Sequence, residues 1–119
     1  MTHFFTDPSA LRFLKYLDLV NSASDNSYVA KLNDPETKVL NTLALFWYGS
    51  EPLTVMDAVR VNTQCSTSST HRILKRLRQK EYIEHIPCER DNRVKYLLPT
   101  AATMAYFAVM GQCLIDSQG

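Results

Sequence analysis

The stretch Ser66–Ile83, STSSTHRILKRLRQKEYI, carries the clearest helical pattern in this 119-residue chain. Apolar or small side chains recur along it at the spacing of one helix face: Thr70, Ile73, Leu74 and Leu77. The opposite face carries polar and basic side chains: Ser68, Ser69, His71, Arg72, Lys75, Arg76 and Gln79. We therefore predict a helix from about Ser68 to Lys80, capped by Ser66 or Thr67, with a buried face and a basic outer face.

After Tyr82 the apolar period changes from helical to two, which predicts a β-hairpin. Its parts are a strand over Ile83–Ile86, a polar tip over Cys88–Arg93 and a return strand over Val94–Leu98. The pair Asp91-Asn92 in the tip suits a tight turn.

Helices are also predicted before this stretch. Asp7-Pro8 and Asp34-Pro35 each place a side-chain acceptor before a proline, which is typical of a helix start. The first helix is expected from about 8 to 21, followed by a polar loop at 21–26. The second is expected to end at Gly49, in the left-handed conformation of a helix C-cap.

Two more helices flank the central pattern. Thr54 precedes a short helix, and Asp57 three residues later forms a partial capping box with it. Residues 62–66 are then the turn that leads to the basic helix. Thr100 can cap a last helix through about Asp116, which is apolar on most sides and must therefore bury against something.

This order of elements predicts a mostly α fold with a small β-hairpin wing, a winged helix-turn-helix. The length suits one domain of roughly 100–150 residues, so a single winged-helix domain over 1–119 is expected. Within it, residues 8–50 are the N-terminal helices, 53–100 the winged core and 101–116 the C-terminal helix.

Positive charge is concentrated in one third of the chain. Nine basic and four acidic residues lie between Arg60 and Lys95, a net charge of +5, whereas the whole chain carries +1. A polyanion-binding face inside a near-neutral protein has this distribution. Charge alone leaves a second interpretation open, a solvated basic helix without a partner.

The basic helix followed by the wing favours double-stranded DNA, because an α-helix fits the major groove and presents its N-terminal half to base edges. The wing tip can reach an adjacent minor groove or its phosphates. The candidate DNA-binding residues are Thr67, Ser68, Ser69, His71, Arg72, Lys75, Arg76, Arg90, Asn92 and Arg93. Arg78 can lie to one side of this face and stay solvated.

Ser66–Ile83, with its ending LRQKEYI, resembles the recognition helix and exit of MarR-type regulators, and Asp91-x-Arg93 followed by Lys95, Leu97 and Thr100 resembles their wing. The resemblance covers about residues 53–100. It implies a transcriptional repressor or activator that binds a near-palindromic operator as a homodimer. It also implies that Arg93 approaches DNA and that Asp91 orients it.

Two features depart from that family. Glu81 occupies the position of a helix-ending glycine, which predicts a less tight exit turn or a slightly longer helix. The chain is also short, with one helix after the wing. The first and last helices are the expected dimer interface, since their apolar area exceeds what one small domain needs.

Other classes of function find little support. The three cysteines, Cys65, Cys88 and Cys113, form no CxxC pair. The three histidines, His3, His71 and His85, lack the spacing of metal ligands, so no metal or cofactor is predicted. The serines and threonines at 66–70 lack the nucleophile elbow of a hydrolase, so an enzyme is not indicated. Cys65 precedes a helix N-terminus, which leaves redox sensing open as an alternative.

No signal peptide or membrane-spanning stretch is indicated, and a cytoplasmic location is expected. A small-molecule effector between the first two helices and the last is compatible with this fold, but no polar groups define its site. The alternative function is a winged-helix module that binds protein without specific DNA binding.

Overall fold

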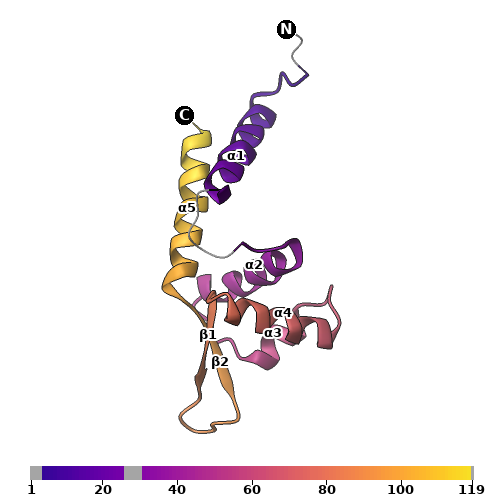
Figure 1. Cartoon of the computed structure of the whole chain (residues 1–119), viewed down its shortest axis with the longest axis vertical. Helices are drawn as coiled ribbons and strands as arrows, with labels where there is room; N and C mark the ends of the chain where they lie inside the picture. Colours follow the sequence, from indigo (N-terminus) through magenta and orange to yellow (C-terminus); the bar gives the residue numbers. More distant parts are fainter. Residues whose placement is uncertain (1–3, 26–30, 119) are drawn as a thin grey trace. The chain divides into compact units, whose positions relative to one another are not determined.

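The computed structural model describes residues 4–25 and 31–118, and the chain divides into two compact units. The first unit takes in Met1–Ala30 and Met104–Gly119, and the second takes in Lys31–Thr103. The first unit contains α1 (Pro8–Asp25) and most of α5 (Ala101–Ser117). The second contains α2 (Asp34–Tyr48), α3 (Val55–Val61), α4 (Thr67–Gln79), β1 (Ile83–Pro87) and β2 (Lys95–Pro99). Figure 1 shows these elements, and the mostly α fold with a β-hairpin wing is confirmed.

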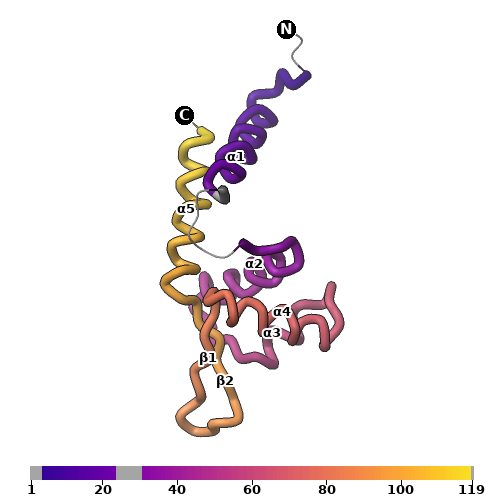
Figure 2. The backbone as a smooth tube through the Cα atoms, in the orientation of Figure 1, coloured from indigo at the N-terminus to yellow at the C-terminus, as the bar shows by residue number. Residues whose placement is uncertain are grey.

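The second unit is built around the buried stripe of α4. Helix α4 packs on α2 and α3, and its end leads into the hairpin, as the tube in Figure 2 shows. The predicted inward residues of α4 are all buried: Thr70, Ile73, Leu74 and Leu77. They share the core with apolar side chains of the other elements: Val39, Leu40, Leu43, Leu53, Ala58, Tyr82, Ile83 and Leu97. The helical spacing of the sequence therefore identified the core face of this helix correctly.

The hairpin is fastened to the helices by main-chain and side-chain hydrogen bonds. Strands β1 and β2 pair antiparallel, with Ile83 opposite Pro99. The Leu97 amide donates to the Leu53 carbonyl over 2.7 Å, so the segment before α3 adds to the edge of the hairpin. The indole Nε1 of Trp47 on α2 donates to the Leu97 carbonyl over 3.0 Å. Leu97, which is fully buried, thus connects the wing to α2 through its carbonyl and to the segment before α3 through its amide.

Helix α1 is longer than the sequence predicted. It continues through Asp25, so residues 21–25 are helical and the predicted loop is wrong over that part. The reason is that these polar residues include neither glycine nor proline, and serine, asparagine and aspartate cost a helix only fractions of a kcal/mol each. Asn26, the last residue of the predicted loop, lies outside the described residues.

Two helices end in the same way, with a residue other than glycine in the left-handed conformation. After α2, the predicted left-handed Gly49 has φ −78°, and Ser50 adopts φ 58° instead. After α4, Glu81 adopts φ 66°. The Glu81 amide donates to the Arg78 carbonyl over 3.0 Å and the Tyr82 amide to the Leu77 carbonyl over 2.9 Å. This pair of bonds is a Schellman motif.

The expectation that Glu81 would loosen or lengthen the end of α4 is therefore wrong. The helix ends at Gln79, and Glu81 makes the tight turn itself. Tyr82 and Leu77, which are both buried, supply the apolar contact that accompanies this motif. Their burial compensates for the backbone strain at Glu81.

Replacing Glu81 by glycine is expected to raise the free energy of unfolding by about 1 kcal/mol. Glycine adopts the left-handed backbone conformation without the steric cost that glutamate has there, and this gain exceeds the larger entropy that glycine loses on folding. Urea denaturation measures the change. The matched control is Gln79→Gly in the last turn of the same helix, which should destabilise the protein by about 1 kcal/mol. Equal effects of the two changes would contradict the assignment of strain to Glu81.

Candidate nucleic-acid interface

The N-terminus of α4 is capped by Ser66. Its Oγ accepts the Ser69 amide over 3.1 Å and donates to the Ser69 hydroxyl over 2.9 Å. Ser69 is half-buried in this arrangement, whereas Thr67 and Ser68 are exposed. The Ser68 hydroxyl also lies 3.3 Å from the Ser66 Oγ. Of the predicted DNA-binding residues on this turn, Ser68 and Ser69 therefore both contact the cap residue, and Thr67 and Ser68 are exposed to solvent.

The outer face of α4 is exposed as predicted. The side chains of His71, Arg72, Lys75 and Arg76 are all exposed, while the core stripe of the same helix is buried. No acidic residue lies within α4 itself. The helix therefore presents basic and hydrogen-bonding groups to solvent along its length, with its positive dipole end at Thr67.

At the wing tip, Asp91 holds Arg93 by three hydrogen bonds. Its Oδ1 accepts the Arg93 amide over 3.0 Å and the Arg93 Nε over 3.1 Å, and its Oδ2 accepts Nη2 over 3.3 Å. These bonds lower the pKa of the Asp91 carboxyl. The Arg93 side chain is nevertheless 91% exposed. The expected contact in which Asp91 orients Arg93 is present, and the guanidinium remains accessible at the tip beside the exposed Arg90 and Asn92.

One half-buried side chain of the hairpin was assigned to no site from the sequence. His85 on β1 has a lowered pKa, because its ring is desolvated and because Arg78 and Lys95 place positive charge near it. The signal in the sequence was the two-residue period of the strands, which puts His85, Leu97 and Lys95 on one face of the hairpin. His85 is therefore less readily protonated than a free histidine, and Arg78, which is exposed, places positive charge near it.

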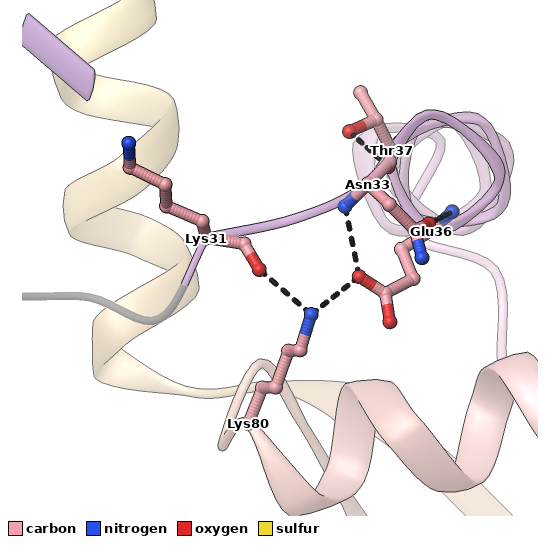
Figure 3. A network of polar contacts seen from close by, with 5 residues as sticks. All are labelled: Lys31, Asn33, Glu36, Thr37 and Lys80. Carbon is pink, nitrogen blue, oxygen red and sulfur yellow. Dashed lines mark hydrogen bonds and ion pairs between the residues drawn. The ribbon is translucent and has the colours of Figure 1, made fainter. Parts of the chain in front are cut away.

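Lys80, the C-cap residue of α4, forms an ion pair with Glu36 on α2. Its Nζ donates to the Glu36 Oε1 over 2.6 Å and to the Lys31 carbonyl over 2.7 Å, as Figure 3 shows. Glu36, on the first turn of α2, is 1% exposed. Burial raises the pKa of this carboxyl, but hydrogen bonds from Lys80 and the Asn33 amide outweigh burial, so its pKa lies below the ordinary value. One of the nine basic charges between Arg60 and Lys95 therefore serves an internal ion pair.

The cysteines occupy separate environments. Cys113 is buried, and Cys65 and Cys88 are half-buried. Backbone N–H groups of Arg90 and Asp91 lower the pKa of the Cys88 thiol.

Among the residues that the structure describes, no three His, Cys, Asp or Glu side chains lie together as a metal site would require, and His3 falls outside them. The helices described are also too short or too polar to cross a membrane.

Neither the scan against protein-family models nor the search of curated proteins finds a match. Several solved structures do match. A mutant of MarR from Escherichia coli, complexed with operator DNA, is 20% identical, with 88% of this chain and 67% of that chain covered and a TM-score of 0.54.

Two further structures give higher TM-scores. MepR from Staphylococcus aureus, bound to ethidium bromide, is 16% identical, with 96% of this chain and 79% of that chain covered and a TM-score of 0.65. The transcriptional regulator Tm0710 from Thermotoga maritima is 15% identical, with 91% and 70% covered and a TM-score of 0.64. At these identities the likeness concerns the fold. The chain has the winged helix-turn-helix fold of the MarR-type regulators.

Proposed function

We propose that the protein is a sequence-specific, double-stranded DNA-binding transcriptional regulator. The observation that carries the proposal is the pairing of two exposed basic elements in one compact unit. One is the outer face of α4, and the other is the wing tip with Arg93 oriented by Asp91. Either element alone occurs on many surfaces that bind nothing.

In this proposal α4 enters the major groove. Thr67, Ser68, His71 and Arg72 lie in its N-terminal half, where a recognition helix meets base edges. Lys75 and Arg76 follow one turn later and meet phosphates. Arg93 reaches the adjacent minor groove, where a narrow groove attracts arginine. Ser69, whose amide and hydroxyl both bond to Ser66, approaches DNA from the same turn in this proposal.

The proposal includes a homodimer formed through α1 and α5. Both helices of the first unit expose large apolar side chains: Leu11, Phe13, Leu17, Met104, Val109, Leu114 and Ile115. A monomer rarely leaves so many exposed. An isologous two-fold contact would place two copies of α4 about one DNA turn apart, ~34 Å, on a near-palindromic operator.

The decisive experiment is selection of bound fragments from random duplex DNA by the full chain, with its mass in solution measured by light scattering. Enrichment of a two-fold symmetric site by a dimer is the expected result. Binding that is absent, or that does not weaken as salt is raised, would overturn the proposal and favour the protein-binding module, because phosphate contacts release counterions.

Replacing Arg72 or Arg93 by alanine is expected to weaken binding to the selected fragment at fixed salt by about 1–3 kcal/mol each, the range for loss of a specific base contact. Fluorescence anisotropy with a labelled duplex measures the affinity. Lys38→Ala is the matched control, since Lys38 is an exposed cation on α2 outside the proposed interface. If neither arginine variant differs from the control, these two residues do not have the proposed roles.

A further inference from the structure

The Lys80–Glu36 ion pair connects the exit of α4 to the first turn of α2. We infer that Glu36 and Lys80 are positioning residues, which hold the recognition helix α4 at the orientation in which its N-terminal half reads bases. The inference rests on the proposed function. We call the contact among Lys80, Glu36 and the Lys31 carbonyl the clasp.

The clasp is anchored on a rigid part of α2. Glu36 is the third residue of this helix and belongs to its capping box: the Asn33 amide donates to Oε1 over 2.9 Å, and the Glu36 amide donates to the Asn33 Oδ1 over 2.9 Å. Figure 3 shows Oε1 lying between Asn33 and Lys80. The carboxylate is therefore held from both sides, and it can in turn hold the ammonium of Lys80 in one place.

Burial makes this anchor specific. Glu36 is 1% exposed, and its second oxygen, Oε2, has no hydrogen-bond partner among the described residues. A buried carboxylate with one free oxygen depends strongly on the cation that it has. Lys80 is that cation, and any displacement of the end of α4 would pull it away.

The other side of the same helix end is also fixed. The Thr100 hydroxyl donates to the Glu81 carbonyl over 2.5 Å, and the Thr103 hydroxyl donates to the Tyr82 carbonyl. The clasp and these two threonines thus hold the exit of α4 between α2 and the start of α5. Thr67 to Arg72 lie about 12–20 Å along the helix from Lys80, at 1.5 Å per residue. A small tilt of α4 at its C-terminal end therefore displaces Thr67 to Arg72. Binding sites require their side chains to lie within about 0.5 Å of the productive position, so such a displacement would weaken base recognition.

Lys80 is poorly placed to bind a phosphate itself. Its side chain is 30% exposed, and two of its three donors are used inside the protein. Lys75 on the same helix is exposed. The two lysines can therefore be compared directly in an experiment, because the Lys80 charge is paired within the protein and the Lys75 charge faces solvent.

The test compares the full-length wild type with Lys80→Gln, Lys75→Gln, Glu36→Gln and the double variant Glu36→Gln/Lys80→Gln. The probes are the duplex selected by the wild type and a scrambled duplex of equal length, titrated by anisotropy over a salt series. Circular dichroism at the same temperature gives the folded fraction, and affinities are expressed per folded protein. The double variant has the net charge of the wild type, and both single lysine variants lose the same charge.

We expect Lys80→Gln to weaken binding of the selected duplex by about tenfold, the loss of roughly one base contact, with little change for the scrambled duplex. Its salt slope should equal that of the wild type. Lys75→Gln should weaken both duplexes alike and reduce the slope by about 0.9. The double variant should recover most of the affinity, because two neutral amides can form the hydrogen bond without a buried charge.

Two outcomes would overturn the inference while leaving the proposed function intact. One is that Lys80→Gln behaves as Lys75→Gln does, which would make Lys80 a phosphate contact. The other is that folded Lys80→Gln binds both duplexes as the wild type does, which would make the clasp a matter of stability alone. A wild type that binds neither duplex would overturn the proposed function and the inference together.

Discussion

Replacing Lys80 by methionine is expected to lower the free energy of unfolding by about 3–5 kcal/mol near neutral pH. Methionine keeps the length of the lysine stem but removes the ammonium that is hydrogen-bonded to the buried Glu36 carboxylate. Glu36 is 1% exposed and already has one unpartnered oxygen, so the loss of Lys80 leaves the Asn33 amide as its remaining hydrogen-bond donor among the described residues. The control is Lys75→Met, because Lys75 is exposed on the same helix and should shift stability by no more than about 0.5 kcal/mol.

The deficit of Lys80→Met should depend on pH with a definite sign. In the wild type, the pKa of Glu36 lies below the ordinary value of a glutamate, so its stabilising contribution is complete above that value and is lost as the pH falls through the folded pKa. In the variant, the hydrogen bond and the charge of Lys80 are lost, whereas burial, the Asn33 amide and the charge of Arg76 still act on the carboxyl. Its pKa is therefore higher than in the wild type, so protonation relieves the penalty at a higher pH. The difference between variant and wild type should therefore shrink on acidification.

Urea denaturation at about pH 7.5 and about pH 5 measures both effects, since both conditions lie above the ordinary pKa of a glutamate, where the wild-type carboxyl stays ionised. A deficit that stays constant or grows at the lower pH would show that the loss comes from packing of the lysine stem. A deficit no larger than that of Lys75→Met would show that the clasp contributes little to stability.

Replacing Leu77 by alanine should cost about 2–5 kcal/mol of unfolding free energy. Leu77 is fully buried, lies on the core stripe of α4 and supplies the carbonyl that accepts the Tyr82 amide. The substitution leaves a cavity beneath the Schellman turn, where the strained backbone at Glu81 limits how far the site can collapse.

Chemical denaturation measures the loss, and Lys75→Ala is the control on the exposed face of the same helix. A loss near that of the control would mean that the core relaxes around the smaller side chain. Because a domain of this size has only about 5–15 kcal/mol in total, the predicted loss would leave part of the population unfolded at physiological temperature.

Several parts of the site could be predicted from sequence because each depends on local spacing. The stripe of Thr70, Ile73, Leu74 and Leu77 follows from the helical period, and all four are buried. The Asp91–Arg93 contact was available from the resemblance to a known wing, and the structure contains it. The capping box of Thr54 and Asp57 is complete, with each side chain accepting the other's amide.

Other parts depend on residues far apart in the chain, and spacing carries no signal for them. In the sequence, Lys80 is only one of nine basic residues between Arg60 and Lys95, but the fold places its Nζ 2.6 Å from Oε1 of Glu36, forty-four residues away. Glu81 looked like an obstacle to a tight turn. The burial of Tyr82 and Leu77 supports the left-handed backbone there, and a pattern of single residues does not measure that compensation.

The sequence by itself determined the elements and their faces: a helix with one apolar and one basic side, followed by a hairpin with a charged tip. These follow from the fixed periods of helix and strand, which are properties of the local backbone. Only the tertiary structure decided which charged side chains face solvent and which form buried ion pairs. It also decided which contacts fix the C-terminal end of α4. Those outcomes depend on burial and on contacts between distant segments. Glu36 is buried and therefore needs the cation of Lys80, whereas Lys75 and Arg76 on the same helix remain exposed.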